Sequence, residues 1–242
     1  MRYLVISDIH ANLVALEAVL QDAEGDWDRI WCLGDIVGYG PSPNECADLL
    51  QQFDHLSLSG NHDWAVLGKL EIESFNSEAR MALRWTQEII SEETRAFLEQ
   101  LPPLLEEAPF TLAHGSPRQP VWEYILDERS AAENFFHFTT AYCLVGHTHV
   151  PLVFEELDGG RCRGSLPRYD GPMLLGERRL IINPGSVGQP RDSDPRAAYA
   201  LLDSEAMTWE HRRVPYDISV TQDRMRAQGM PFRLVARLEL GW

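Results

Sequence analysis

The sequence predicts an α/β fold with two sheets, and three features of the chain indicate it. Region 2–59 alternates short apolar runs with amphipathic stretches, which is the β-α-β-α-β order of a mostly parallel sheet. Polar clusters of Asp, Asn and His follow five of the apolar runs, at the point where each strand would end. After Pro151 the pattern changes to short strand-like runs between turns, which predicts an antiparallel sheet packed against the first.

The opening region contains three predicted strands and two predicted helices, separated by a glycine- and proline-rich loop at 34–43. The strands are expected at 2–7, 29–33 and 55–59, and the helices at 12–24 and 43–53. The apolar residues of the first helix recur three or four positions apart and share one face: Leu13, Leu16, Leu20 and Ala23.

The region 74–100 is the most helical stretch of the chain. Ser74 and Ser91 are candidate N-caps, because a hydroxyl can accept a hydrogen bond from the free N–H groups of a first helical turn. Pro102 and Pro103 would end the helical region, since proline cannot continue it.

The remaining elements follow from shorter runs of the same kinds. A helix near 129–138 separates strands at 109–113 and 141–146, and the tail contains a helical stretch at 217–228 and a strand-like one at 231–238. Strand-like runs after Pro151 stand at 151–157, 173–176, 179–183, 197–203 and 207–214. We expect one domain over 1–242, because the polar clusters end at His149 and the later strands are needed to cover the sheet.

Composition limits the classes of function. The chain has 242 residues, of which 44% are hydrophobic and 24% charged, as in ordinary soluble globular proteins. Its formal charge of −16 argues against a general polyanion binder, so no extended nucleic-acid surface is expected. Four cysteines have no CxxC spacing, and no apolar run approaches the ~18 residues of a membrane span. Met1 lies too close to the first polar cluster for a signal peptide, so we expect a cytoplasmic protein that does not enter the membrane.

The polar clusters predict a metal site. In open α/β sheets ligands collect beyond the carboxyl ends of the strands, so five such strand ends in one sheet would converge on one crevice. The donors are oxygens and imidazole nitrogens without thiolate, which suits Mn, Fe or Zn. The clusters are Asp8-Ile9-His10, Gly34-Asp35, Gly60-Asn61-His62-Asp63, His114-Gly115 and Gly146-His147-Thr148-His149.

This set resembles the calcineurin-like metallophosphoesterase superfamily, whose pattern is D-x-H, G-D-x-x-G, G-N-H-[DE], a lone His and G-H-x-H. All five blocks are present in order, with no ligand substituted. The segment 183–188 also looks like that of small bacterial phosphodiesterases of the superfamily. The resemblance implies a two-sheet αββα sandwich of the metallophosphoesterase type that binds two divalent metal ions, Mn first, with Fe, Zn, Ni or Co as alternatives.

The resemblance also implies a role for each ligand. Asp35 would bridge the two metals, and a hydroxide between them would attack phosphorus. The other ligands would divide between the metals as Asp8, His10 and His149 for the first, and Asn61, His114 and His147 for the second.

The residues after Asn61 have a predicted catalytic role. By the resemblance, His62 meets the scissile phosphate and stabilises or protonates the leaving oxygen, while Asp63 orients His62 and raises its pKa. Taken alone, the same four residues would be a turn with a capping Asp.

Other polar residues allow two interpretations each. Arg118 and Arg191 could contact the substrate phosphate with bidentate geometry, or they could be solvated loop arginines. Segment 183–186 could supply amides or a hydroxyl to the site, or be only a tight turn. The stretch Arg161–Arg168 is interpreted first as an exposed hairpin loop and second as a patch that binds phosphate or a partner. The histidines outside the motifs are expected to be surface or packed imidazoles: His55, His137 and His211.

We therefore predict a dinuclear metal-dependent phosphoesterase that hydrolyses phosphodiester or phosphomonoester bonds. Alternatives are a protein Ser/Thr phosphatase, a dinucleoside polyphosphate hydrolase and a catalytically silent scaffold of the same fold. The expected partner is a small phosphorylated substrate or a phosphoprotein, and seven tryptophans leave a homo-oligomer open.

Overall fold

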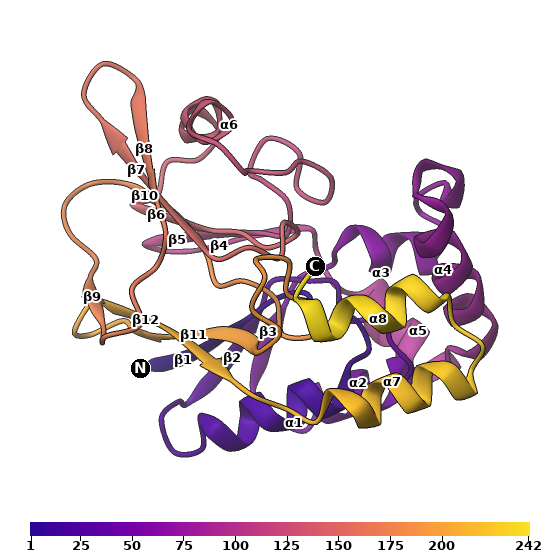
Figure 1. Ribbon diagram of the computed structural model, residues 1–242. Coiled ribbons are helices and arrows are strands. Elements are labelled where there is room, and N and C mark those ends of the chain that lie inside the picture. The colour runs from indigo at the N-terminus through magenta and orange to yellow at the C-terminus, as the bar shows by residue number, and fades with distance from the viewer.

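Two mixed six-stranded sheets form the centre of the computed structural model, which describes residues 1–242 (Figure 1). Helices cover the outer faces of both sheets, so the layers are helix, sheet, sheet, helix, as the predicted αββα sandwich requires. None of the helices combines the length and apolar character that crossing a bilayer requires.

The first sheet contains the N-terminal strands. β1, β2 and β3 are parallel, and β11 adds to β1 antiparallel, followed by β12 and β9. In spatial order the strands are β3 (His55–Ser57), β2 (Arg29–Cys32), β1 (Arg2–Ile6), β11 (Ala197–Asp203), β12 (Thr208–Val214) and β9 (Met173–Leu174).

The second sheet is built around three parallel strands, β5, β6 and β10, with antiparallel strands at both sides. In spatial order the strands are β4 (Leu104–Glu107), β5 (Phe110–Ala113), β6 (Tyr142–Leu144), β10 (Leu180–Asn183), β7 (Leu152–Leu157) and β8 (Arg161–Ser165).

The helices connect strands or cover the sheets. The helices are α1 (Leu13–Asp22), α2 (Pro43–Leu50), α3 (Asn61–Val66), α4 (Ser77–Ile89), α5 (Glu92–Glu99), α6 (Glu128–Asn134), α7 (Ile218–Ala227) and α8 (Phe232–Leu240), with 3-10 turns η1 (Ile72–Ser74) and η2 (Phe135–His137). Apolar residues of α1 and α2 pack on one face of the first sheet, and α6 packs on the second.

Alternation along β1 separates the two faces of the first sheet. Val5 points between the sheets and packs with Leu112 and Leu144, whereas Leu4 and Ile6 face the helices. Successive side chains of a strand point to opposite faces, so one short apolar run supplies both cores.

The prediction that the second half forms its own antiparallel sheet is wrong. β10 pairs with β6 in parallel and β11 pairs with β1, so the later strands divide between both sheets. Without the later strands, β1 of the first sheet and β6 of the second would each expose unpaired backbone N–H and C=O groups along one edge. The later strands satisfy those edges.

Three local predictions also need correction. Region 231–238 is not a strand but most of α8, in which Leu234, Val235 and Leu238 face the core and Gly241 ends the helix in the left-handed conformation. Asn76, not Ser74, caps α4, whereas Ser91 caps α5 as predicted. The expected loop at Arg161–Arg168 begins with the strand β8.

Candidate metal centre

The five polar clusters meet, but they come from two sheets and not from one. β1, β2 and β3 of the first sheet supply three clusters, and β5 and β6 of the second supply the other two. The two groups of parallel strands end at the same edge of the sandwich, where the side chains from both sheets face one another. Convergence at carboxyl strand ends was predicted correctly, and its confinement to one sheet was wrong.

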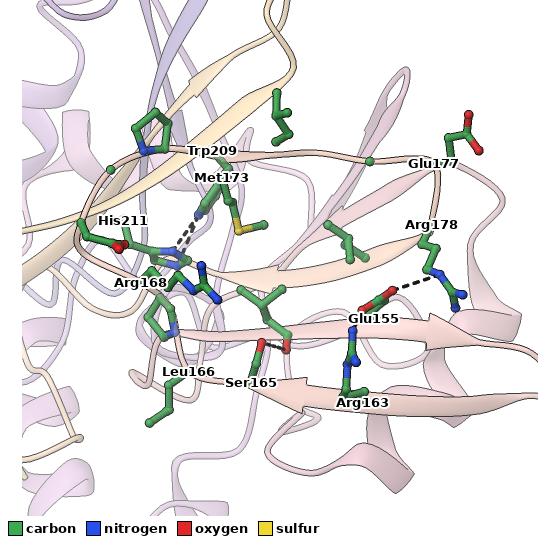
Figure 2. Close-up of a pocket in the computed structure, with 18 residues that line it drawn as sticks. Glu155, Arg163, Ser165, Leu166, Arg168, Met173, Glu177, Arg178, Trp209 and His211 are labelled. Atoms are coloured by element: carbon green, nitrogen blue, oxygen red, sulfur yellow. Dashed lines mark hydrogen bonds and ion pairs between the residues drawn. The ribbon is translucent and has the colours of Figure 1, made fainter.

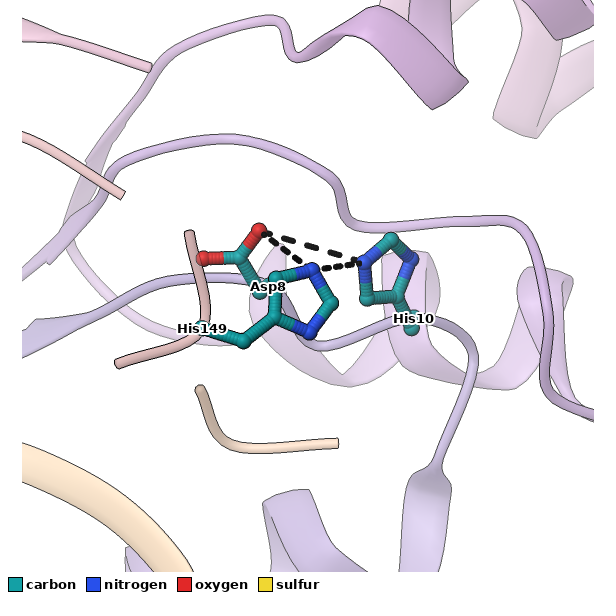
Figure 3. Close-up of side chains that lie close together, drawn as sticks. All are labelled: Asp8, His10 and His149. Atoms are coloured by element: carbon teal, nitrogen blue, oxygen red, sulfur yellow. Dashed lines mark hydrogen bonds and ion pairs between the residues drawn. The ribbon is translucent and has the colours of Figure 1, made fainter. Parts of the chain in front are cut away.

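Asp8, His10 and His149 form the first group of buried donors (Figure 3). The Nε2 atom of His149 lies 3.3 Å from Asp8 Oδ1, and the Nε2 atom of His10 lies 3.8 Å from the same oxygen. The two Nε2 atoms are 3.1 Å apart. All three side chains are buried.

The hydrogen bonds of this group leave lone pairs facing each other. His10 Nδ1 lies 3.3 Å from the Val37 carbonyl oxygen and His149 Nδ1 lies 2.6 Å from that of Gln189. A carbonyl only accepts, so each Nδ1 carries the hydrogen and each Nε2 presents a lone pair. Asp8 Oδ1 has no hydrogen-bond partner. Two lone pairs and a carboxylate oxygen directed at one point suit a cation.

His114 belongs to a second group with Asp35 and His147. Its Nδ1 donates to the Leu33 carbonyl at 2.9 Å, so its Nε2 is directed at Asp35 Oδ2, 3.4 Å away, and Asn61 Oδ1, 3.2 Å away. These contacts place Asn61 with His114 and His147, the set of ligands to which the family resemblance assigned it. Two oxygens and two imidazoles are again donors that suit Mn, Fe or Zn.

His147 is fixed through its backbone and its ring. Its backbone N–H donates to Asp8 Oδ2 at 3.0 Å, and its Nε2 lies 3.3 Å from the Trp122 carbonyl oxygen. That hydrogen bond leaves Nδ1 as the nitrogen with a free lone pair. The Tyr124 ring stacks on the imidazole at 3.9 Å with an interplanar angle of 23°.

Asp35 connects the two groups. Its Oδ1 accepts the backbone N–H of His62 at 2.8 Å, while its Oδ2 has no hydrogen-bond partner. Oδ2 lies 3.5 Å from His10 Nε2 and 3.4 Å from His114 Nε2. One unsatisfied carboxylate oxygen therefore stands between the nitrogens of both groups, which is the position of a bridging ligand.

Unusual backbone conformations hold these side chains in place. Predicted ligands with positive φ angles between 48° and 63° are Asp8, His10, Asp35, His147 and His149. L-residues adopt this region rarely, and each instance costs about 1–3 kcal/mol. Glycines make the close approaches possible: a Cβ at Gly60 would lie 2.0 Å from Asp35 Oδ1, and one at Gly146 would lie 1.9 Å from Ser7 Oγ.

Burial keeps most of the imidazoles neutral. It lowers the pKa values of His10, His147 and His149 well below the ordinary value, because a charged imidazole loses its hydration inside the protein. A neutral imidazole is the form that binds a metal. Burial also raises the pKa of Asp8 to about 6.

His114 and Asp35 influence each other more strongly. Burial opposes the charged imidazolium, but the neighbouring Asp35 carboxylate raises the pKa of His114 to about 9. Burial likewise opposes the Asp35 carboxylate, and the imidazoles of His114 and His62 hold its pKa below the usual range. Asp35 is thus the carboxylate whose charge the site stabilises most.

His62 lies at the site, but Asp63 does not act on it as predicted. Asp63 accepts the backbone N–H groups of Val37 and Gly60, at 3.1 and 2.9 Å, and makes no hydrogen bond to His62. Burial lowers the pKa of His62 to about 4, although Asp35 acts in the opposite direction. The prediction that Asp63 raises this pKa is wrong, since its carboxylate ties two loops together. His62 Nδ1 has no hydrogen-bond partner.

The two arginines lie in different surroundings. Arg118 directs its guanidinium at Glu123 and Glu133, and its contacts do not favour the predicted role in substrate binding. Arg191 donates its backbone N–H to the carbonyl of the ligand candidate His149 at 3.2 Å, and its Nε is buried without a partner. The structure therefore brings Arg191, and not Arg118, to the predicted ligands.

The segment 183–188 supports the metal centre from behind. Asn183 Nδ2 donates to the Gly146 carbonyl at 2.8 Å, and Ser186 Oγ donates to the Asp8 carbonyl at 2.8 Å. Of the two interpretations left open, these contacts favour a role at the site, as a support of the loops that carry Asp8 and His147. Tyr39 was missed: its ring packs at 4.7 Å from that of His10 and 4.3 Å from that of His62. Its only signal was its place in the loop at 34–43.

A large cavity lies away from this centre and contains none of the predicted ligands. It measures about 1060 Å³ and lies between β8 and the β9 loop (Figure 2). Glu155 pairs there with Arg178 at 3.1 Å and with Arg163, and Trp209 Nε1 donates to His211 Nδ1 at 3.0 Å. No buried polar side-chain atom of its lining lacks a hydrogen-bond partner, and its remaining charged side chains are exposed to solvent: Arg168, Asp170 and Glu177.

Comparison with known proteins gives matches over most of the chain. A family model described as the calcineurin-like phosphoesterase superfamily domain matches residues 1–207. The crystal structure of a metallophosphoesterase from Sphaerobacter thermophilus is similar with a TM-score of 0.91 and 49% identity, covering 100% of this chain and 99% of that one. The region after residue 207, with α7 and α8, is therefore also shared with a relative.

Two curated proteins extend the comparison. An uncharacterized protein of Methanocaldococcus jannaschii is 40% identical over 244 residues, which cover 98% of this chain and 97% of that protein. Phosphodiesterase YfcE of Escherichia coli (strain K12) is 25% identical over 220 residues, which cover 86% of this chain and 90% of that protein.

Proposed function

Because the chain belongs to the calcineurin-like phosphoesterase superfamily, we propose that it hydrolyses phosphodiester or phosphomonoester bonds with two divalent cations. One observation carries the proposal. The unsatisfied Oδ2 of Asp35 lies between the Nε2 atoms of His10 and His114, which belong to separate groups of donors. A carboxylate oxygen shared by two sets of lone pairs is what a dinuclear centre requires.

Each group of side chains holds one cation in this proposal. Asp8, His10 and His149 hold the first, and Asp35 belongs to both sets. The second is held by Asn61, His114 and His147. The donor types favour Mn, with Fe, Zn, Ni or Co as alternatives. When bound, such a pair of cations neutralises charge on a phosphate and makes water acidic enough to attack at neutral pH.

The remaining side chains position the substrate. Arg191 stands beside His149, and although its Nη2 donates to Gln189 Oε1 at 2.9 Å, its Nε has no partner and can donate to a phosphate oxygen. His62 lies in one group with His10 and Asp35, and its Nδ1 is free of other partners. It stabilises or protonates the leaving oxygen. Its low pKa favours hydrogen-bond donation by a neutral ring over transfer from a charged one.

Phosphodiesters are the first choice of substrate. The relative YfcE is named a phosphodiesterase, and a protein with a formal charge of −16 suits small substrates better than long polyanions. A protein Ser/Thr phosphatase and a dinucleoside polyphosphate hydrolase are the enzyme alternatives, and a silent scaffold is the non-enzyme alternative. All the ligand candidates are present, which supports an enzyme over a scaffold.

A panel of substrates tests the proposal. Bis-p-nitrophenyl phosphate, p-nitrophenyl phosphate, a dinucleoside polyphosphate and a phosphopeptide are assayed with Mn and after chelation, and metal content is measured by mass spectrometry. We expect about two metal ions per chain and Mn-dependent hydrolysis of the diester. Hydrolysis of the phosphopeptide or the polyphosphate alone would favour the corresponding alternative. Two bound ions without any hydrolysis would indicate the scaffold.

A further inference from the structure

Three aromatic side chains lie beside the metal centre. We call Phe75, Trp122 and Tyr124 the aromatic rim. The Phe75 ring meets the His62 ring edge-on at 5.2 Å and the Trp122 ring edge-on at 5.3 Å. Tyr124 stacks on His147 at 3.9 Å. The rim thus contacts the predicted catalytic histidine through Phe75 and a predicted metal ligand through Tyr124.

The position of the rim relative to the centre is fixed by a hydrogen bond. His147 Nε2 lies 3.3 Å from the Trp122 carbonyl oxygen, so the backbone that carries the indole is held at the ligand. Because this contact uses the backbone, substitution of the Trp122 side chain leaves it in place. The rim brings together two loops that are distant in sequence. Phe75 lies just before α4, whereas Trp122 and Tyr124 lie in the loop between β5 and α6.

The rim leaves large apolar surface open to solvent. Trp122 is 39% exposed and Tyr124 is 47% exposed, although the histidines that they adjoin are buried. Exposed apolar side chains that occur singly need no explanation. Here three rings from two loops gather at one buried polar centre. A group that covers them would remove apolar area from water and is therefore favoured.

The charged groups of the site indicate that a ligand covering the rim also has a phosphate group. Arg191 lies with its guanidinium carbon 5.8 Å from the centre of the Tyr39 ring, and Tyr39 in turn packs on His10 and His62. A phosphate directed to the donor groups and Arg191 would have an ester substituent within reach of the rim, which borders the centre at His62 and at His147. The ligand that fits has a phosphate and, attached to it, a flat apolar group.

We propose that the aromatic rim binds the nucleobase of a nucleotide phosphodiester, and this inference rests on the proposed function. A nucleobase is flat, and all bases present a π-face to an aromatic side chain, so stacking requires no particular sequence. Stacking of this kind contributes about 1–3 kcal/mol per base, which is a factor of roughly 5 to 150 in affinity. The substrate class is therefore small nucleotide diesters, and the rim sets specificity without touching the reacting atoms.

Two substrates with the same leaving group test the proposal. Thymidine 5′-(p-nitrophenyl phosphate) carries a base, and methyl p-nitrophenyl phosphate does not. With the Mn-loaded full chain, we expect kcat/KM to be at least about 10-fold higher for the nucleotide, mainly through KM. Trp122→Ala should reduce this ratio about 10-fold, and Trp122→Phe should retain most of it. Phe136→Ala, at a ring that is 77% exposed, is the matched control and should keep the ratio.

A binding measurement separates this inference from the proposed function. Calorimetry compares thymidine 5′-monophosphate with 2-deoxyribose 5-phosphate on the Mn-loaded protein, so no turnover is needed. We expect the nucleotide to bind about 10-fold more tightly, and Trp122→Ala to remove the difference. Equal affinities would overturn the rim as a base site even if diesters are hydrolysed. Equal losses for both substrates in Trp122→Ala, together with lower metal content, would show that the rim only holds His147 and would also overturn it.

Discussion

The metal centre and the cavity between β8 and β9 are both lined with polar side chains, but only in the cavity do all the buried polar atoms have hydrogen-bond partners within the protein. In the cavity, Glu155 lies between two arginines, and both nitrogens of His211 have hydrogen-bond partners. In the metal centre, Asp8 Oδ1 and Asp35 Oδ2 are buried without partners. Burying an unpaired carboxylate oxygen is costly, so it persists where a ligand supplies the missing partner.

The backbone shows the same difference. Five ligand candidates have positive φ angles, whereas the residues that line the cavity adopt this region only at Gly171. Strain of this kind is retained where the surroundings hold it in place and where the resulting geometry is useful. A polar cluster with satisfied bonds and relaxed backbone supports structure, and one with unsatisfied atoms on strained backbone indicates a binding site. The size of a cavity decides neither.

The largest effect is expected from Asp35→Asn. This change removes a negative charge between two groups of donors, while the amide oxygen can still accept the His62 N–H. We expect kcat/KM for bis-p-nitrophenyl phosphate to fall on the order of 10³-fold, because a bound metal contributes several kcal/mol. Metal content should fall in the same variant, as measured by mass spectrometry.

Arg118→Ala is the comparison for that variant. Arg118 is held by Glu123 and Glu133 and makes no contact with a ligand candidate, so its loss should change kcat/KM much less. Full metal occupancy with near-normal rates in Asp35→Asn would contradict the bridging role and, with it, the distinction between the two polar clusters.

His62→Ala should give the next largest effect. His62 belongs to neither set of metal ligands, so both cations should remain bound while kcat falls on the order of 10²-fold. The loss should be smaller for p-nitrophenolate than for an alkyl leaving group, since a good leaving group needs less stabilisation. The measurement is the slope of log kcat against leaving-group pKa. An unchanged slope would leave His62 as a phosphate-binding residue at most.

Much of the metal centre could be predicted because its residues are local in sequence. A short apolar run followed by Asp8 or His147 predicts both the end of a strand and the polar side chain at that end. The carboxyl ends of parallel strands lie at one edge of a sheet, so these side chains are expected close together. The family assignment followed from those same blocks and is confirmed. Asp35 could be proposed as the bridge because it is the one carboxylate of the central cluster and stands between glycines.

What could not be predicted depends on contacts between distant segments. Which sheet receives β10 or β11 is decided by free edges that exist only after folding. Asp63 was assigned to His62 because they are adjacent in sequence, but its oxygens face the backbone of Val37 and Gly60. In α8, the spacing of Leu234 and Leu238 fits a helix, although the run also reads as a strand.

His211 should make stability depend on pH at the cavity. Trp209 Nε1–H donates to its Nδ1, and its Nε2–H donates to the Asn183 carbonyl at 3.0 Å, so the ring is neutral. Burial lowers its pKa to about 4 from an ordinary 6.5, and the unfolded chain therefore binds more protons between these values. Stability is full above pH 6.5 and is lost as the pH falls toward 4.

This effect amounts to about 2 kcal/mol between pH 7 and pH 5, with the free energy of unfolding lower at pH 5. It is measured as the difference in pH dependence between the wild type and His211→Gln, both by urea denaturation of chelated protein. The glutamine variant should lose less stability on acidification. Parallel curves for the two proteins would show that His211 is not held neutral, and that the cavity is less well satisfied than its hydrogen bonds indicate.

The smallest effect is expected from Arg163→Ala. Its guanidinium pairs with Glu155, but its side chain is 64% exposed, so solvent screens the attraction. Glu155 keeps Arg178 at 3.1 Å after the substitution, and no buried charge is left alone. Exposed ion pairs contribute about 0–1 kcal/mol, so the free energy of unfolding in urea should change by less than about 1 kcal/mol. The matched change at the metal centre, Asp8→Ala, should instead strongly reduce metal-dependent stabilisation, because it removes the one carboxylate that belongs to the first group alone. If Arg163→Ala cost as much as Asp8→Ala in the Mn-loaded protein, the ion pairs of the cavity would be essential to the fold, and satisfaction of polar groups would not distinguish the two regions.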